Sequence, residues 1–97
     1  MREPRYVISI AARMIGVHTH TLRYYERVGL VEPARSDTNL RLYSDEDIER
    51  LRRIRSLMGE MGVNLAGVEV ILNLLARMEE MQRQIDSMAR APRRAQK

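Results

Sequence analysis

Two glycines divide the first third of the chain into short helical segments. Ser9 can cap a helix that Gly16 ends, and a second helix is expected to begin near Thr19 and to end at Gly29. Glycine suits both ends because it adopts the left-handed conformation that closes many helices. Two short helices joined by a tight turn that contains glycine are typical of the helix-turn-helix, so the sequence predicts a mainly α fold of that kind.

A β-hairpin, or wing, is predicted after the second helix. Pro33 disfavours helix, and the turn-forming residues 36–39 (SDTN) separate two stretches that are rich in apolar residues. Residues 30–32 and 40–43 are therefore expected to form its two strands. The whole unit is then a winged helix-turn-helix.

Two further helices are predicted beyond the wing. Ser44 and Asp47 have the spacing of a capping box at the start of the first. Its apolar residues recur at a helical period: Ile48, Leu51, Ile54, Met58 and Met61. Asn64 can cap the second helix, which is expected to cover residues 65–89.

The last helix carries an apolar seam with heptad spacing. Its members alternate at intervals of three and four residues: Ile71, Leu74, Met78, Met81, Ile85 and Met88. A seam of about two and a half heptads is too short to be stable alone, so a second copy of the chain is expected to cover it. The alternative is a helix that folds back onto the core of its own domain.

Positive charge gathers at the two ends of the chain. Residues 1–43 carry seven arginines and four acids, and residues 90–97 carry four basic groups and no acid, whereas the stretch between them is weakly acidic. This distribution indicates an anionic partner, with nucleic acid favoured over an acidic protein. We expect a winged helix-turn-helix DNA-binding domain over 1–67, a coiled-coil dimerisation helix over 68–89, and a basic disordered tail over 90–97.

Several classes of site are excluded. Cysteine is absent, so disulfides, thiolate metal sites and thiol catalysis are ruled out. His18 and His20 are two residues apart, so on a helix they would point to opposite sides and could not share one metal ion. Neither a glycine-rich phosphate loop nor a nucleophile motif is present, so no enzyme activity and no cofactor are expected. Without a secretory signal or a long apolar run, a cytoplasmic protein is expected.

The second helix carries the predicted DNA-reading face. Leu22 and Tyr25 are three residues apart and are expected to face the core. Another face repeats at positions i, i+3, i+4 and i+7: His20, Arg23, Tyr24 and Arg27. Arginine can pair with both acceptors of a guanine edge, and histidine and tyrosine can reach phosphates or bases. Thr19 can add a hydroxyl contact. The alternative, a merely solvated face, is disfavoured by the position between a helix-turn and a wing.

The wing is expected to hold phosphates that flank the groove. Arg35, Asn39 and Arg41 lie on or beside the predicted hairpin, and Tyr43 is assigned the same role as Arg41. Turn formation alone would also explain Asn39, and strand solubility alone would explain Arg41.

The stretch ISIAARMIGVHTHTLRYYERVGLVEPARSDTNLRLYSDEDIERL resembles the winged-helix DNA-binding domain of the MerR family of bacterial transcription regulators. The matching pieces are TLRYYERVGLV, RLYSDED and the helix that follows. Further on, MGVNLAGVEVIL is similar to the heat-shock repressor branch of that family, HspR. The resemblance covers residues 6–75.

The resemblance implies a homodimer joined by an antiparallel coiled coil of the last long helix, bound to a palindromic operator. It also implies repression of heat-shock and chaperone genes, with the DnaK chaperone as co-repressor. Metal sensing, which many members perform through cysteines, is not expected in this chain. Two alternatives stay open: a MerR-type activator of another stress response, and a dimeric adaptor for protein interactions that no longer binds DNA.

Two positions depart from the branch. Leu42 stands where the wing would have a second arginine before Tyr43, and residues 18–21 (HTHT) stand where a proline would be expected. The base preference is therefore expected to differ from that of the branch's usual operator.

Overall fold

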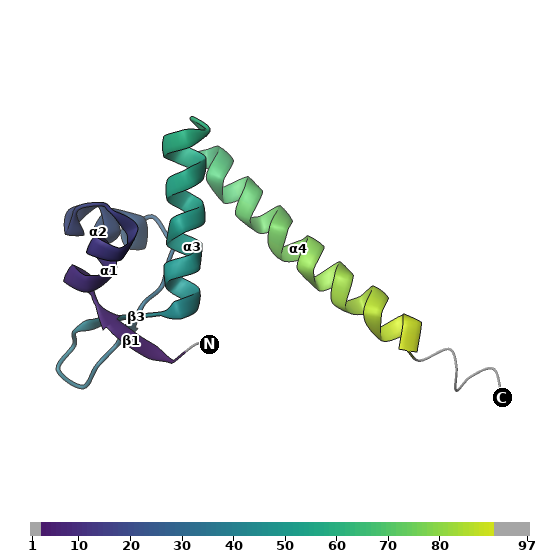
Figure 1. Cartoon of the computed structure of the whole chain (residues 1–97), viewed down its shortest axis with the longest axis horizontal. Helices are drawn as coiled ribbons and strands as arrows, with labels where there is room; N and C mark the ends of the chain where they lie inside the picture. Colours follow the sequence, from purple (N-terminus) through teal and green to yellow (C-terminus); the bar gives the residue numbers. More distant parts are fainter. Residues whose placement is uncertain (1–2, 91–97) are drawn as a thin grey trace. The chain divides into compact units, whose positions relative to one another are not determined.

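The computed structural model describes residues 3–90 and divides the chain into two compact units, Met1–Val63 and Asn64–Lys97. The first unit holds three helices, a π-helical turn and a small sheet, and the second is one long helix, α4 (Leu65–Arg90). The predicted mainly α fold with a winged helix-turn-helix is confirmed (Figure 1). The predicted basic tail over 90–97 lies outside the described residues, apart from Arg90.

The helix-turn-helix consists of α1 (Ile8–Ile15) and α2 (Thr19–Arg27). Gly16, with φ of 86°, ends α1, and its backbone N–H donates to the carbonyl oxygen of Ala12 at 2.8 Å. This left-handed backbone favours glycine, which has no Cβ to clash with the chain. Both helices therefore end where the glycines predict.

The predicted cap of the first helix is wrong. Val7 occupies the N-cap position and offers no side-chain hydrogen bond, while Ser9 lies inside the first turn of α1. The reason is a strand that the sequence did not reveal, β1 (Pro4–Val7), which runs directly into the helix.

Three antiparallel strands form the sheet, in the order β1-β3-β2. The central strand is β3 (Arg41–Ser44), and β2 is only Ala34–Arg35. Figure 1 shows β1 and β3 side by side at the end of the sheet where the chain enters α3 (Asp45–Arg55). The hairpin is confirmed, but the strand predicted over 30–32 is wrong, since the first strand of the hairpin begins at Ala34.

The core of the first unit lies between the helices and the sheet. Leu30 and Val31, adjacent in the sequence, are both buried. A strand with one face in solvent would expose one of them, because successive side chains of a strand point to opposite faces, whereas a loop packed on the core can bury both. The largest fully buried side chains of the unit come from α2, the loop after it, β3 and α3: Leu22, Leu30, Tyr43, Leu51 and Ile54.

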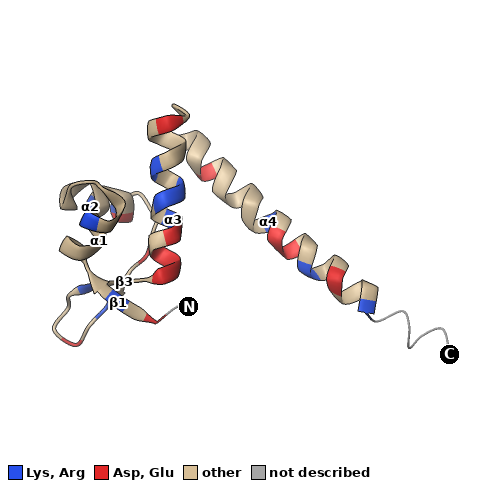
Figure 2. Cartoon of the chain, in the orientation of Figure 1, with Lys and Arg blue, Asp and Glu red and all other residues tan. Residues whose placement is uncertain are grey.

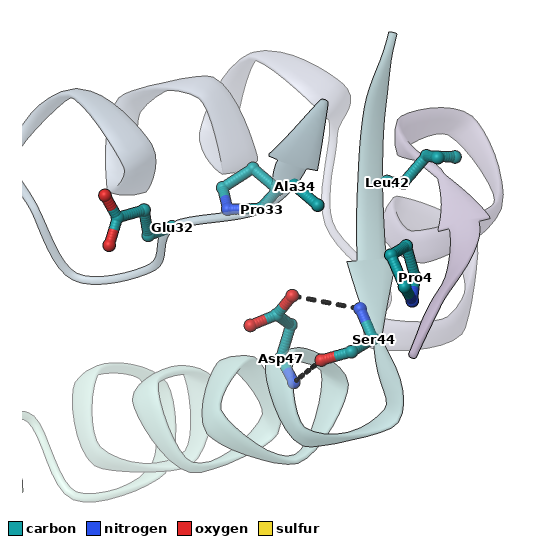
Figure 3. Close-up of a pocket in the computed structure, with 7 residues that line it drawn as sticks. All are labelled: Pro4, Glu32, Pro33, Ala34, Leu42, Ser44 and Asp47. Atoms are coloured by element: carbon teal, nitrogen blue, oxygen red, sulfur yellow. Dashed lines mark hydrogen bonds between the residues drawn. The ribbon is translucent and has the colours of Figure 1, made fainter. Parts of the chain in front are cut away.

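A capping box starts α3, as predicted. The Ser44 hydroxyl accepts from the backbone N–H of Asp47 at 3.1 Å, and the Asp47 carboxylate accepts from the backbone N–H of Ser44 at 2.9 Å (Figure 3). Acids occupy the first turn and arginines the last, which suits the helix dipole (Figure 2).

A π-helical turn over Ser56–Glu60 continues α3, and the N–H of Met61 donates to the carbonyl oxygen of Ser56 at 3.1 Å. A π turn adds a residue to the helical repeat, so later side chains rotate about the axis. Met61, which continues the predicted apolar period, is therefore exposed, whereas Leu57 is buried.

Helix α4 begins as predicted. The side-chain oxygen of Asn64 accepts from the backbone N–H of Gly67 at 2.8 Å and so caps the first turn. Among the residues described, no helix has the length and apolar character to cross a membrane.

The two serines at helix starts predict opposite mutational effects. Ser44→Ala should lower the free energy of unfolding by about 1 kcal/mol, because it removes one partner of the capping box. Ser9→Ala should change it little, because Ser9 is exposed and caps nothing in α1. Urea titration of both variants measures the difference, and equal losses would contradict the assigned caps.

Candidate nucleic-acid interface

Helix α2 separates its side chains as the sequence predicts. Leu22 and Tyr25 are buried in the core. All four members of the predicted reading face are exposed: His20, Arg23, Tyr24 and Arg27. We call these four residues the reading face. Thr19, at the first position of α2, is half-buried. Their contacts with DNA stay a prediction.

One pair within the reading face is already ordered. The guanidinium carbon of Arg27 lies 5.6 Å from the centre of the Tyr24 ring. A cation over an aromatic face is held by the ring's electron density, so this contact restricts the two exposed side chains. Arg23, the residue before Tyr24 on the same exposed face, has no hydrogen bond or ion pair within the described part of the chain.

The sequence predicted that the two histidines would point to opposite sides, but they lie together. Their rings stack, with centroids 5.4 Å apart and planes 10° from parallel. The prediction assumed helical geometry, but His18 is the N-cap residue and has extended backbone angles (φ −79°, ψ 154°). In residues 3–90, no group of three or more histidine, cysteine or acidic side chains is placed to hold a metal ion.

The two wing arginines converge on one carboxylate of α2. The Glu26 carboxylate accepts from Nε of Arg41 at 2.5 Å and from Nη2 of Arg35 at 3.1 Å. Arg35 also donates through Nη1 to the backbone carbonyl of Asn39 at 3.2 Å. The sequence brought Arg35, Asn39 and Arg41 together but did not identify Glu26. We call these four residues the wing clamp.

The charge on Glu26 is stabilised by its partners. Partial burial opposes ionisation, but the hydrogen bond and positive charge of Arg41, together with those of Arg35, outweigh it and hold the Glu26 pKa below its ordinary value of 4.5. The same contact raises the pKa of Arg41. Both ion pairs are therefore intact at neutral pH.

Asn39 shapes the tip of the wing. Its φ of 66° is left-handed, a conformation that asparagine tolerates better than most residues. Its backbone N–H donates to the carbonyl oxygen of Ser36 at 2.8 Å, and the backbone N–H of Ser36 donates to the carbonyl oxygen of Leu40 at 2.9 Å. Turn formation thus accounts for Asn39 without a DNA contact.

The phosphate contact predicted for Tyr43 is wrong for this structure. Its side chain is 0% exposed, and its hydroxyl is buried without a hydrogen-bond partner in the described residues. Burial raises the pKa of that hydroxyl. Tyr43 is in the central strand, which α1 and α3 contact, so it serves the core. Arg41, nearer the wing tip, keeps 26% of its side chain exposed.

An open hollow of about 410 Å³ lies between the sheet and the start of α3, and Figure 3 shows the residues that line it. Two of these are Glu32 and Asp47, and the Asp47 carboxylate is engaged in the capping box. Two negative charges disfavour a phosphate in this hollow. The surface suited to DNA is therefore the reading face with the wing.

The Glu26 ion pairs predict a specific dependence on pH. Because the Glu26 pKa is lower in the folded chain than in the unfolded chain, its stabilisation is present above pH 4.5 and is lost as the pH falls through the folded value. Glu26→Gln should therefore be less stable than the wild type by about 1 kcal/mol at pH 7. Urea titrations from pH 7 to acid should show this difference shrink below the ordinary glutamate pKa. A difference that persists unchanged in acid would contradict the pairing.

The comparisons with known proteins agree with this geometry. Residues 6–75 match the family model described as MerR HTH family regulatory protein. The chain is 44% identical to the heat shock protein HspR of Streptomyces coelicolor over 88 residues, which make up 91% of this chain and 58% of that protein. It is 31% identical to the mercuric resistance operon regulatory protein of Bacillus cereus, over 92% of this chain and 79% of the relative.

Solved structures show the same fold. The transcription regulator PbrR691 from Ralstonia metallidurans CH34, in complex with lead(II), superposes with a TM-score of 0.69 at 30% identity, covering 95% of this chain and 75% of that one. HiNmlR, a MerR family regulator bound to promoter DNA, has a TM-score of 0.63 at 20% identity, covering 93% and 76%, and supports the fold alone. The chain belongs to the MerR family of helix-turn-helix transcription regulators.

Proposed function

We propose that this chain is a sequence-specific DNA-binding regulator that reads the major groove with α2 and holds phosphates with its wing. The observation that carries the proposal is the reading face, exposed on α2, with the wing arginines joined to the same helix through Glu26. A recognition helix needs polar side chains free to meet base edges, with cations beside it for the phosphates.

Arg23 is the proposed base-reading residue. The competing role, an ion pair with Glu26 one turn along α2, is not formed, since Glu26 is engaged by Arg35 and Arg41. The guanidinium of Arg23 thus keeps its planar set of donors, which matches the two acceptors of guanine in the major groove.

The proposed assembly is a homodimer through α4. Of the six predicted seam residues, Ile71 is half-buried in the single chain. The other five are between 52% and 66% exposed: Leu74, Met78, Met81, Ile85 and Met88. A row of exposed apolar side chains at heptad spacing favours burial against a second helix. A two-fold dimer would present two reading helices, which suits a palindromic operator.

Repression of heat-shock or chaperone genes is the proposed biological role. The identity with HspR supports it, although the chain spans 58% of that protein's length. DnaK is accordingly the co-repressor that we propose to test. A second candidate role is activation of another stress response, because a mercuric resistance operon regulatory protein is also among the relatives. A reporter gene placed behind the operator separates the two, because deletion of a repressor raises expression and deletion of an activator lowers it.

Arg23→Ala tests the DNA-reading proposal. It should lower the ratio of operator affinity to random-duplex affinity by about 5- to 150-fold, the range expected when one bidentate base contact is lost. Arg23→Lys should recover only part of the ratio, since an ammonium lacks the planar fork. Fluorescence anisotropy at one fixed salt concentration measures both affinities.

Arg77→Ala is the matched control for Arg23→Ala. It removes the same charge from an exposed position on α4 and should leave the ratio unchanged. Affinities that fall equally on both duplexes in Arg23→Ala would instead make Arg23 a phosphate contact. Binding that does not weaken as salt is raised would favour the adaptor alternative, because phosphate contacts release counterions.

Paired charges in the seam test the dimer. Met78→Asp with Met81→Asp should convert the dimer to a monomer, because two carboxylates would have to be buried in an apolar interface. Sedimentation velocity measures the change. Asn73→Asp with Ala76→Asp adds the same charge at exposed positions outside the seam and should leave the dimer intact. A dimer that survives the methionine changes would place the interface elsewhere.

A further inference from the structure

The pairing of the wing creates an electrostatic problem that Glu26 resolves. Arg35 of β2 lies directly opposite Arg41 of β3 in the antiparallel register. Two like charges at opposing positions of a strand pair destabilise it. The Glu26 carboxylate accepts from both arginines, one at each of its oxygens, and therefore places a negative charge between them.

The wing has little else to hold it beside α2. Strand β2 is two residues long, so its ladder with β3 is short. The tip is closed by the turn at Asn39, whose carbonyl oxygen accepts from Arg35. Contacts therefore run without a break from α2 through Glu26 and Arg35 to the tip.

The two arginines use different atoms in the wing clamp. Arg41 binds Glu26 through Nε, which leaves both of its terminal nitrogens without a partner in the described part of the chain. Arg35 spends both terminal nitrogens, one on Glu26 and one on Asn39. A phosphate needs free donors, so the geometry suits Arg41 for DNA and Arg35 for support.

From these contacts we propose that Glu26 is a positioning residue for DNA recognition, which holds the wing at α2 and directs Arg41 to the phosphate. Arg35 is its structural partner and not a DNA contact. The inference rests on the proposed function. It gives a role to an acid on a surface where the surrounding arginines attract DNA. Glu26 is 23% exposed, so its ion pairs are less screened by solvent than pairs on an open surface.

Glu26→Gln separates positioning from charge alone. Loss of one negative charge should strengthen binding to random duplex, because the net charge rises near the phosphates. Loss of the anchored wing should at the same time lower the ratio of operator to random-duplex affinity by about tenfold, the effect of a misplaced phosphate and groove contact. A pure charge effect would raise both affinities by the same factor and leave the ratio unchanged, which would overturn the proposal.

Glu49→Gln is the matched control. Glu49 is an exposed acid of α3 whose carboxylate lies 4.0 Å from Arg52, so its replacement removes the same charge away from the wing. It should leave the affinity ratio unchanged. If Glu26→Gln instead lowers both affinities in proportion to a loss of thermal stability, Glu26 serves the fold and not positioning.

A measurement without DNA distinguishes failure of this inference from failure of the proposed function. The backbone N–H groups of Ser36 and Asn39 are hydrogen-bonded within the wing turn, so their hydrogen exchange reports on wing order. Glu26→Gln should speed their exchange about tenfold while amides of α3 keep their rates. Unchanged exchange would overturn the positioning role even if the wild type reads its operator. Faster exchange in a protein that does not bind DNA would leave the clamp standing and reject the proposed function.

Arg35→Gln and Arg41→Gln complete the test. Arg35→Gln should speed exchange in the wing turn, as Glu26→Gln does, because both break the path to the tip. Arg41→Gln should weaken binding to both duplexes, because it removes a phosphate donor, while exchange in the wing turn stays near the wild-type rate because the path through Arg35 is intact. The reverse pattern would exchange the roles of the two arginines.

Discussion

Strand β3 is the element on which the rest of the first unit depends. It is the middle strand of the sheet, so β1 and β2 both pair with it and not with each other. At its end Ser44 supplies the capping box that starts α3, and within it Tyr43 fills the core. A single stretch of four residues thus joins the sheet, the core and the longest helix of the unit. Its first residue, Arg41, extends the same connection to α2 through Glu26.

This arrangement explains how a small domain can present an ordered surface to DNA. Recognition helices are rigid, but wings built on short strands need further support. Here the support comes from an acid on α2, whose charge also relieves the repulsion between two facing arginines. The two wing arginines are therefore partly committed within the protein. Their commitment differs, because Arg41 keeps its terminal donors free and Arg35 does not.

Acidic residues gather around the start of α3. Asp45 accepts from the Tyr6 hydroxyl and from Arg5, both at 2.8 Å, and these contacts lower its pKa. They tie β1 to the first turn of α3, beside the hollow that Glu32 and Asp47 border (Figure 3). The first unit therefore separates an acidic helix start from the arginines of α2 and the wing. Such a distribution orients a DNA-binding domain as well as attracting it.

The sequence by itself determined the features that local chemistry controls. Glycine at 16 and 29, serine and aspartate at 44 and 47, and asparagine at 64 marked helix ends because each satisfies backbone groups within a few residues. The helical period likewise separated Leu22 and Tyr25 from the reading face. These signals, with the resemblance that they carry, were sufficient for the fold class and for the family.

Tertiary structure decided whatever depends on residues far apart in the chain. Strand β1 has four residues and no apolar alternation, and it exists because β3, over 30 residues later, offers it a partner. Tyr43 is buried because helices cover the central strand. Its hydroxyl group and the nearby Arg41 had instead suggested a surface position. Glu26 faces the wing only once the hairpin folds beside α2, and the π turn displaced Met61 from the predicted helical face. In each case the deciding energy is long-range packing or pairing, for which a local pattern carries no signal.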